Sequence, residues 1–297
     1  MAQPRSPCGA RNGILVGSRP EHLFRWAFGP IRWTVTAQAS LRKYAPRLLL
    51  AGLWLSLLPI SASAAVRVVS LNLCSDQWLV LLAPERVAAL SLLARDPALS
   101  FVATRAATMP VVRGSAEAVL RLHPDLVLAG PYGAQTTVAL LQAEGLPIHR
   151  IDLPQDFAGI RAQALAVATL LGVPERGAAL VEAMDSTLAA ASRRPPYATA
   201  LAWEPRGYTA GPGSLMDSVL RAAGLTNLSD GRPLGLEGLL RVRPDLLVVP
   251  RAPDYPSLAT DMLDNPAVAD IPRRTVSPAL TVCAGPFTAT AVAMLAR

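Results

Sequence analysis

A segment that occurs twice constrains the fold of this 297-residue chain more than any other feature. Residues 117–130 read EAVLRLHPDLVLAG and residues 237–250 read EGLLRVRPDLLVVP, with six of 14 positions identical. In each copy, apolar residues at helical spacing end at a proline, Pro124 or Pro244, and a continuous apolar run then suits a strand covered on both faces. Self-similarity of this kind indicates duplicated supersecondary units, so the sequence predicts two similar α/β lobes.

The segments around the two copies alternate between strand-like and helical patterns, which predicts parallel sheets in both halves. Between the halves, residues 157–171 and 175–192 have helical patterns. A helix of roughly 20 residues spans about 30 Å, long enough to run beside both lobes as a strut. The predicted fold is therefore α/β, with two similar lobes of mainly parallel sheets, a single long helix joining them, and a ligand cleft between them. The expected divisions are a leader at 1–65, lobes at 66–155 and 197–297, and a helical connector at 156–196.

The positive charge of the chain is concentrated in its first 65 residues. They hold eight Lys and Arg against one acid, 8 − 1 = +7, whereas the remainder is balanced, 20 − 20 = 0. A neutral body without a basic cluster argues against nucleic acid as a partner. Basic residues precede an apolar run over 48–60, and the small residues after it fit cleavage after Ala64. We therefore expect a cleavable signal peptide and a soluble periplasmic protein, because a run of 13 residues is short of the ~20 that a spanning helix needs.

Two cysteines, Cys74 and Cys283, follow the leader, 283 − 74 = 209 residues apart. A disulfide, a metal-ligand role and inert packing are all open at this point, and buried inert thiols are the commoner outcome. A disulfide across the cleft would oppose its opening and closing. Neither a CxxC motif nor a His/Cys cluster is present, and His123 and His149 have no second histidine at metal-binding spacing, so a structural metal site is not expected.

The twin E-x-x-L-R-x-x-P-D-L segments, the helical connector and the export signal together resemble the periplasmic substrate-binding proteins of ABC importers, in the cobalamin and iron-chelate group (class III). Residues 68–91 and 211–229 are also similar to segments of that family, and the resemblance covers residues 66–297. It implies a monomer with no cofactor of its own and no covalent chemistry. Such a protein binds a cobalt or iron chelate, namely cobalamin, a ferric siderophore or haem, and hands it to a permease dimer in the membrane.

Glu117 and Glu237 stand where the family has the two lobe-tip glutamates that dock into arginine pockets of the permease. A carboxylate opposite arginine makes short bidentate hydrogen bonds, and one on each lobe suits a two-fold transporter. The alternative is that each glutamate only stabilises the first turn of a helix through the helix dipole. Its recurrence in both copies, while most neighbours differ, favours docking.

The ligand cleft is expected at the carboxyl ends of the strands, where loops of both lobes face each other. Aromatic side chains there can lie flat on a corrin or porphyrin ring, and arginines can meet its carboxylates, although any single aromatic can equally belong to the core. The residues predicted to bind ligand are Asn72, Cys74, Tyr132, Trp203, Arg206, Tyr208, Arg251 and Cys283.

Two other functions fit parts of the sequence. Cys74 lies on a loop before a helix, as the nucleophile of a periplasmic thiol-dependent enzyme can, but no histidine on a predicted cleft element is available as its base. No G-x-S-x-G, P-loop or G-x-G-x-x-G motif occurs either. The other alternative is a non-transport adaptor that has the same scaffold but an empty cleft.

Overall fold

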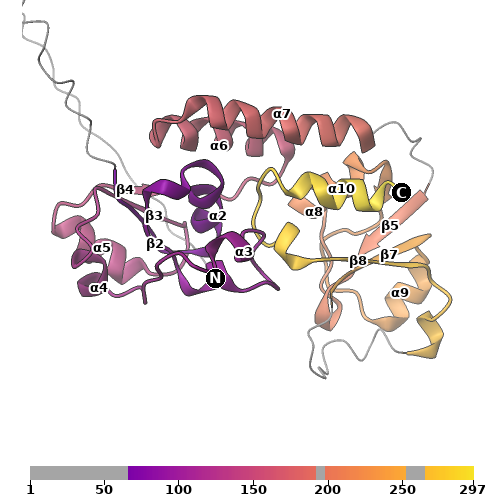
Figure 1. The fold of residues 1–297 in the computed structure, drawn as a ribbon. Helices are drawn as coiled ribbons and strands as arrows, with labels where there is room; N and C mark the ends of the chain where they lie inside the picture. The colour runs from indigo at the N-terminus through magenta and orange to yellow at the C-terminus, as the bar shows by residue number, and fades with distance from the viewer. Residues whose placement is uncertain (1–65, 192–197, 252–264) are drawn as a thin grey trace, which may run out of the picture. The chain divides into compact units, whose positions relative to one another are not determined.

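The computed structural model describes residues 66–191, 198–251 and 265–297 (Figure 1). The predicted leader and signal peptide at 1–65 lie outside these residues. Among the helices of the described ranges, none has the length and apolar character needed to span a bilayer.

Two four-stranded parallel sheets form the two lobes, and they have the same strand order. The first is ordered β2-β1-β3-β4 and the second β6-β5-β7-β8. Val69 pairs with Val127 in the first sheet as Leu201 pairs with Leu247 in the second. The predicted α/β fold with two similar parallel-sheet lobes is confirmed. The strands are β1 (Val68–Ser70), β2 (Val87–Ala89), β3 (Leu126–Ala129), β4 (Ile148–Arg150), β5 (Ala198–Ala202), β6 (Leu225–Asn227), β7 (Leu246–Pro250) and β8 (Arg273–Val276).

Helices cover both faces of each sheet, so successive residues of the central strands are buried on opposite sides. In β3, Val127 packs beneath α4 and α5, whereas Leu126 and Leu128 join a larger core on the other face. In β7, Leu247 likewise packs beneath α9 while Val248 joins that larger core. The α-helices are α2 (Leu73–Leu82), α3 (Ala103–Ala106), α4 (Ala116–Leu120), α5 (Gln135–Ala143), α6 (Phe157–Leu170), α7 (Pro174–Ala191), α8 (Leu215–Ala222), α9 (Leu236–Val242) and α10 (Thr288–Leu295).

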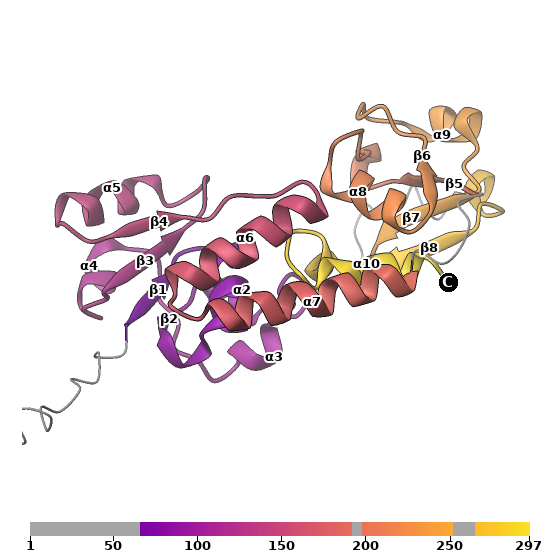
Figure 2. The ribbon, with the colours of Figure 1, turned by 90° about the horizontal axis from the view of Figure 1, so that it is seen from above.

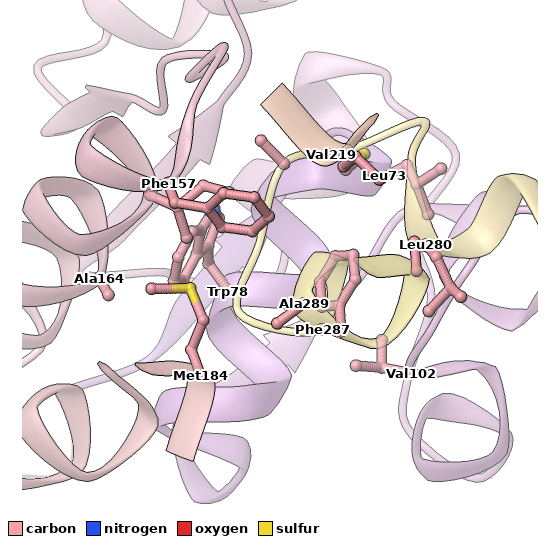
Figure 3. Packing of buried hydrophobic residues seen from close by; sticks show 14 of the residues in the cluster. Leu73, Trp78, Val102, Phe157, Ala164, Met184, Val219, Leu280, Phe287 and Ala289 are labelled. Atoms are coloured by element: carbon pink, nitrogen blue, oxygen red, sulfur yellow. The ribbon is translucent and has the colours of Figure 1, made fainter. Parts of the chain in front are cut away.

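The larger core is shared by the two lobes and the connecting helices. Figure 3 shows Trp78 of α2, Met184 of α7 and Phe287 just before α10 among its members. Because one continuous apolar cluster includes residues from all three parts, the lobes do not have separate cores on this side.

The repeated segment forms the same structure in both lobes. The helices α4 and α9 end before Pro124 and Pro244, and His123 and Arg243 adopt nearly equal left-handed φ angles of 44° and 45°. The aspartate after each proline then ties the turn to the first strand of its lobe. Asp125 accepts a hydrogen bond from the backbone N–H of Arg67 at 2.7 Å. Asp245 accepts one from the N–H of Thr199 at 2.8 Å.

The connector consists of α6 and α7, which pack closely against each other (Figure 2). A Cβ on Gly177 would lie 2.5 Å from the Cβ of Ala168, so the close approach requires glycine at this position. α7 is held to the first lobe by Arg176, which donates to the Leu82 carbonyl at 2.8 Å, and it packs against α10 of the second lobe. Its 18 residues correspond to about 27 Å. The predicted long joining helix is therefore α7.

Within the described residues, direct contacts that join the lobes near the shared core include a disulfide, a ring stack and a hydrogen bond. Cys74 and Cys283 form a disulfide, with their Cα atoms 5.3 Å apart. Phe101 of the first lobe stacks on Phe287 of the second, with ring centroids 4.7 Å apart. The side-chain oxygen of Gln155 accepts a hydrogen bond from the N–H of Leu215 at 3.3 Å. The lobes are therefore linked both covalently and by packing.

Candidate functional site

A pocket of about 350 Å³ lies at the carboxyl edge of the second sheet, where ligands of parallel α/β sheets bind. Its walls are mainly apolar, and Glu204 is the charged residue among them. One wall ends at Val282, next to the disulfide that joins the lobes, so the pocket borders the junction between them. It is lined by Ala202, Glu204, Met216, Val248, Val249, Pro250, Val276, Pro278, Thr281 and Val282.

The loop from Glu204 to Tyr208 is fixed beside this pocket. The N–H of Glu204 donates to the carbonyl of Tyr208 at 2.8 Å, and the N–H of Leu234 donates to the carbonyl of Gly207 at 2.7 Å. Gly207 has a φ of 80°, and a Cβ there would lie 2.5 Å from the Leu234 carbonyl oxygen, so only glycine fits. This anchoring leaves Arg206 and Tyr208 exposed, with 58% of Tyr208 accessible.

Two more of the predicted ligand residues are exposed at strand carboxyl ends. Tyr132 lies in the turn after β3 and is 77% accessible. Arg251 follows β7 directly, is exposed, and is positioned by its N–H, which donates to the carbonyl of Val276 at 3.0 Å. The structure therefore leaves Tyr132, Arg206, Tyr208 and Arg251 free to contact a bound molecule.

Trp203 does not belong to the binding surface, and its predicted ligand role is wrong. Its side chain is only 2% exposed and packs with Leu239 of α9 and Leu247 of β7. Its Nε1 donates to the carbonyl of Leu234 at 2.8 Å, which satisfies the one polar atom of the ring. As the residue after the end of β5, Trp203 continues the alternation of that strand and faces the α9 side of the sheet.

Asn72 has a structural role at the start of α2. Its Oδ1 accepts hydrogen bonds from the N–H of Ser75 at 2.9 Å and from the Ser75 hydroxyl at 2.8 Å, which is the arrangement of a helix N-cap. Its amide also lies against Gly130, where a Cβ would be 1.7 Å from Nδ2. Asn72 was predicted to bind ligand, but its side-chain oxygen is already bonded within the protein.

The disulfide corrects the expectation that Cys74 and Cys283 are separate, inert thiols. Cys74 lies in the first turn of α2 and Cys283 lies before α10, and the shared core brings these two segments together. Sulfur atoms bonded to each other can act neither as thiolate ligands nor as a nucleophile. The disulfide therefore rules out a thiolate ligand at either cysteine and an enzyme that uses the Cys74 thiol.

Sequence reasoning missed the buried carboxyl of Asp76, one turn into α2. Burial raises the pKa of Asp76 to about 7, although hydrogen bonds from Ser70 and Ser91 oppose the shift. The N–H and hydroxyl of Ser91 reach the two carboxyl oxygens at 3.0 and 2.5 Å. Sequence reasoning also missed the pocket residues Glu204, Thr281 and Val282, although the nearby residues Arg206, Tyr208 and Cys283 were predicted, because sequence does not show which side chains of a loop face a cavity.

Glu117 and Glu237 are both exposed, one in the first turn of α4 and one in the first turn of α9. Each helix leads through a short turn into a central strand, so its N-terminus returns to the carboxyl edge of its sheet. The Glu117 backbone N–H and the Ser115 hydroxyl hold the pKa of the Glu117 carboxyl below its usual value. Glu117 is therefore ionised at neutral pH.

Comparison with known proteins identifies related binding proteins. The sequence pattern of the periplasmic binding protein family matches residues 68–272. A curated protein of Halobacterium salinarum, named cobalamin-binding protein, is 30% identical over 120 residues, which are 38% of this chain and 32% of that relative. The match therefore spans about a third of the length of that relative.

Two solved structures resemble this chain over most of its length. The periplasmic heme-binding protein RhuT of Roseiflexus sp. RS-1, solved in apo form, is 26% identical, with a TM-score of 0.62 over 78% of this chain and 97% of that one. The periplasmic heme-binding protein BhuT, solved in complex with two hemes, is 25% identical, with a TM-score of 0.62 over 78% and 96%.

Proposed function

Because the chain belongs to the periplasmic binding protein family, we propose that it captures a metal tetrapyrrole between its lobes and delivers it to the permease of an ABC importer. The family consists of periplasmic solute-binding proteins rather than enzymes. The curated relative is named for cobalamin and the two solved structures for heme, and both ligands are metal-centred tetrapyrrole rings. The proposed route to the periplasm is the signal peptide in residues 1–65.

The pocket at the carboxyl edge of the second sheet is the observation that supports this ligand class. A tetrapyrrole has an apolar ring and polar groups at its periphery, which suit apolar walls beside exposed arginines. In this proposal the ring lies against the pocket walls, Tyr132 and Tyr208 stack on it, and Arg206 and Arg251 meet peripheral carboxylates or amides.

Delivery is proposed to use Glu117 and Glu237. Each is an exposed carboxylate in the first turn of a helix, and each lobe carries one. Two such carboxylates can bind arginines on the two subunits of a permease dimer at the same time, so docking would depend on both lobes.

The ligand is tested by adding hemin, cyanocobalamin or ferrichrome to the mature protein and measuring its thermal midpoint and absorbance spectrum. A ligand at 100 times its Kd stabilises the folded state by about 2.7 kcal/mol, so hemin or cyanocobalamin should raise the midpoint by several degrees. A shift with ferrichrome alone would replace the tetrapyrrole by a siderophore. No shift with any of the three would favour the adaptor function instead.

The site is tested by replacing its aromatic rim. Tyr132→Ala and Tyr208→Ala should each weaken binding of the preferred tetrapyrrole roughly tenfold, because each removes a stacking contact of about 1 kcal/mol or more. Leu140→Ala, at a similarly exposed apolar residue on α5, is the matched control and should leave the Kd unchanged. Equal affinity of all three variants in an absorbance titration would place the ligand elsewhere.

A further inference from the structure

A second charged residue recurs with each docking glutamate. Arg121 follows Glu117 by four residues, and Arg241 follows Glu237 by four residues. Residues four apart lie on the same face of a helix and are separated by about 6 Å along its axis. Each lobe tip, by which we mean residues 117–125 in the first lobe and 237–245 in the second, therefore carries an anion and a cation at a fixed spacing.

The two tips also match in exposure. When residues 117–125 are aligned with residues 237–245, each of the nine positions has the same degree of burial in both lobes, whether exposed, half-buried or buried. Two of the three residues between the charges have changed, for example Val119 to Leu239, whereas the glutamate and the arginine are the same in both copies. Packing does not require the glutamate and the arginine to be retained, because both side chains are exposed in each lobe.

After the Glu117 backbone N–H and the Ser115 hydroxyl, the charge of Arg121 also helps to lower the pKa of the Glu117 carboxyl, but the two side chains do not form an ion pair. Within the part of the chain that the structure describes, the side chains of Arg121 and Arg241 form no ion pair or hydrogen bond. Structural arginines of this protein differ in that respect. Arg161 pairs with Asp185 at 2.6 Å, and Arg176 pairs with Glu85 at 2.7 Å.

The first tip adds a groove of about 630 Å³ beside α4. Two guanidinium groups, those of Arg113 and Arg121, border it, and none of its lining residues is acidic. Its other lining residues are Val111, Val112, Ser115, Ala118 and Leu122, which are mainly apolar. Such a groove complements an apolar segment that carries a carboxylate.

We propose that each lobe docks through its Glu–Arg pair, rather than through the glutamate alone, onto a periplasmic loop of the permease that carries an arginine and a carboxylate about 6 Å apart. The arginine of the permease loop pairs with Glu117 or Glu237. The carboxylate of the same loop pairs with Arg121 or Arg241. At the first tip the same loop extends into the groove, where Arg113 adds a second cation. This inference rests on the proposed delivery function.

The test uses the source organism with the chromosomal gene deleted and variants supplied on a plasmid. Uptake of hemin and of cyanocobalamin is measured, together with the Kd and thermal midpoint of each purified variant. Arg121→Glu combined with Arg241→Glu should lower uptake at least tenfold while the Kd stays within twofold, because both residues lie outside the ligand pocket. Arg105→Glu combined with Arg297→Glu, which reverses two other exposed arginines, is the matched control and should retain full uptake.

The outcomes separate this inference from the function on which it rests. Full uptake by the Arg121→Glu/Arg241→Glu variant, with loss in Glu117→Gln/Glu237→Gln, would overturn the paired contact and leave delivery intact. Uptake that is unaffected by both double variants, or by deletion of the gene, would overturn the delivery function itself. An equal loss in the control variant would show that net charge matters rather than the pair.

Discussion

The α4–β3 segment of the first lobe and the α9–β7 segment of the second have the same backbone path but start differently. The Ser115 hydroxyl accepts a hydrogen bond from the N–H of Ala118 and caps α4, whereas α9 begins at Gly235 without a side-chain cap. In the second lobe, Leu234 packs so closely on α9 that a Cβ on Gly238 would lie 2.5 Å from it. Duplication has therefore preserved the residues that set the turn and the exposed charges, while local packing at the helix starts has diverged.

The first helices of the two lobes differ in the same way. Asp76 of α2 and Asp217 of α8 are both buried acids in a first turn. Asp217 has a cation nearby, because Arg221 lies 3.3 Å from its carboxylate. Asp76 accepts hydrogen bonds from uncharged groups, and burial raises its pKa to about 7. The first helices of the two lobes therefore hold buried acids with different neighbours, a cation beside Asp217 and uncharged groups beside Asp76.

Breaking the covalent link between the lobes should have the largest effect. Cys74→Ser combined with Cys283→Ser should lower the free energy of unfolding by about 3–5 kcal/mol, because the disulfide closes a long loop. Urea denaturation should still show one transition, since the lobes share a core. Reductant should bring the wild type to the stability of the variant and leave the variant unchanged. Two separate transitions in the variant would mean that the disulfide, and not the core, makes the lobes unfold together.

Removing the buried charge of Asp76 should have the next largest effect. The pKa of Asp76 is raised from 3.8 to about 7 in the folded state, so the folded state binds the proton more tightly than the unfolded chain does. The stability that comes from this tighter proton binding is full below pH 3.8 and is lost as pH rises through about 7. Asp76→Asn cannot ionise and should be more stable than the wild type at pH 8 by about 2–4 kcal/mol, since each pKa unit corresponds to 1.36 kcal/mol.

The counterpart in the second lobe is the control for this prediction. Asp217→Asn removes the charge opposite Arg221 and should not stabilise the protein at pH 8. Urea denaturation between pH 4 and pH 8 measures both variants. If the free energy of unfolding of Asp76→Asn depends on pH as that of the wild type does, the buried charge of Asp76 is not the cause of the pH dependence.

Exchanging the helix starts should have the smallest effect. Gly235→Ser adds a cap to α9 and should stabilise the protein by a few tenths of a kcal/mol, and Ser115→Gly should destabilise it by about the same amount. A Cβ at Gly235 meets nothing within 4 Å, so the serine fits without strain. Hydrogen exchange of the first-turn amides of α4 and α9 measures the change locally. Unchanged protection in both helices would show that the caps do not account for the difference between the two starts.

Much of the fold could be predicted because its signals are local. The repeated segments, with Pro124 and Pro244 ending their helices, indicated two similar lobes, and the helical pattern at 175–192 indicated α7. The site was predicted less well. Tyr132, Arg206, Tyr208 and Arg251 are exposed at strand ends as expected, whereas Trp203 is buried. The pattern around Trp203 does not reveal that α9 covers that side of the sheet.

The sequence by itself determined the fold class, the duplication and the family, because hydrophobic period, helix stops and repeated motifs are properties of neighbouring residues. Only the tertiary structure decided that Cys74 bonds Cys283, that Trp203 is core and that Asp76 is a buried acid of raised pKa. Each of these depends on which distant segments of the chain come to lie within a few ångströms, since covalent pairing, burial and desolvation are set by distance in space rather than along the sequence.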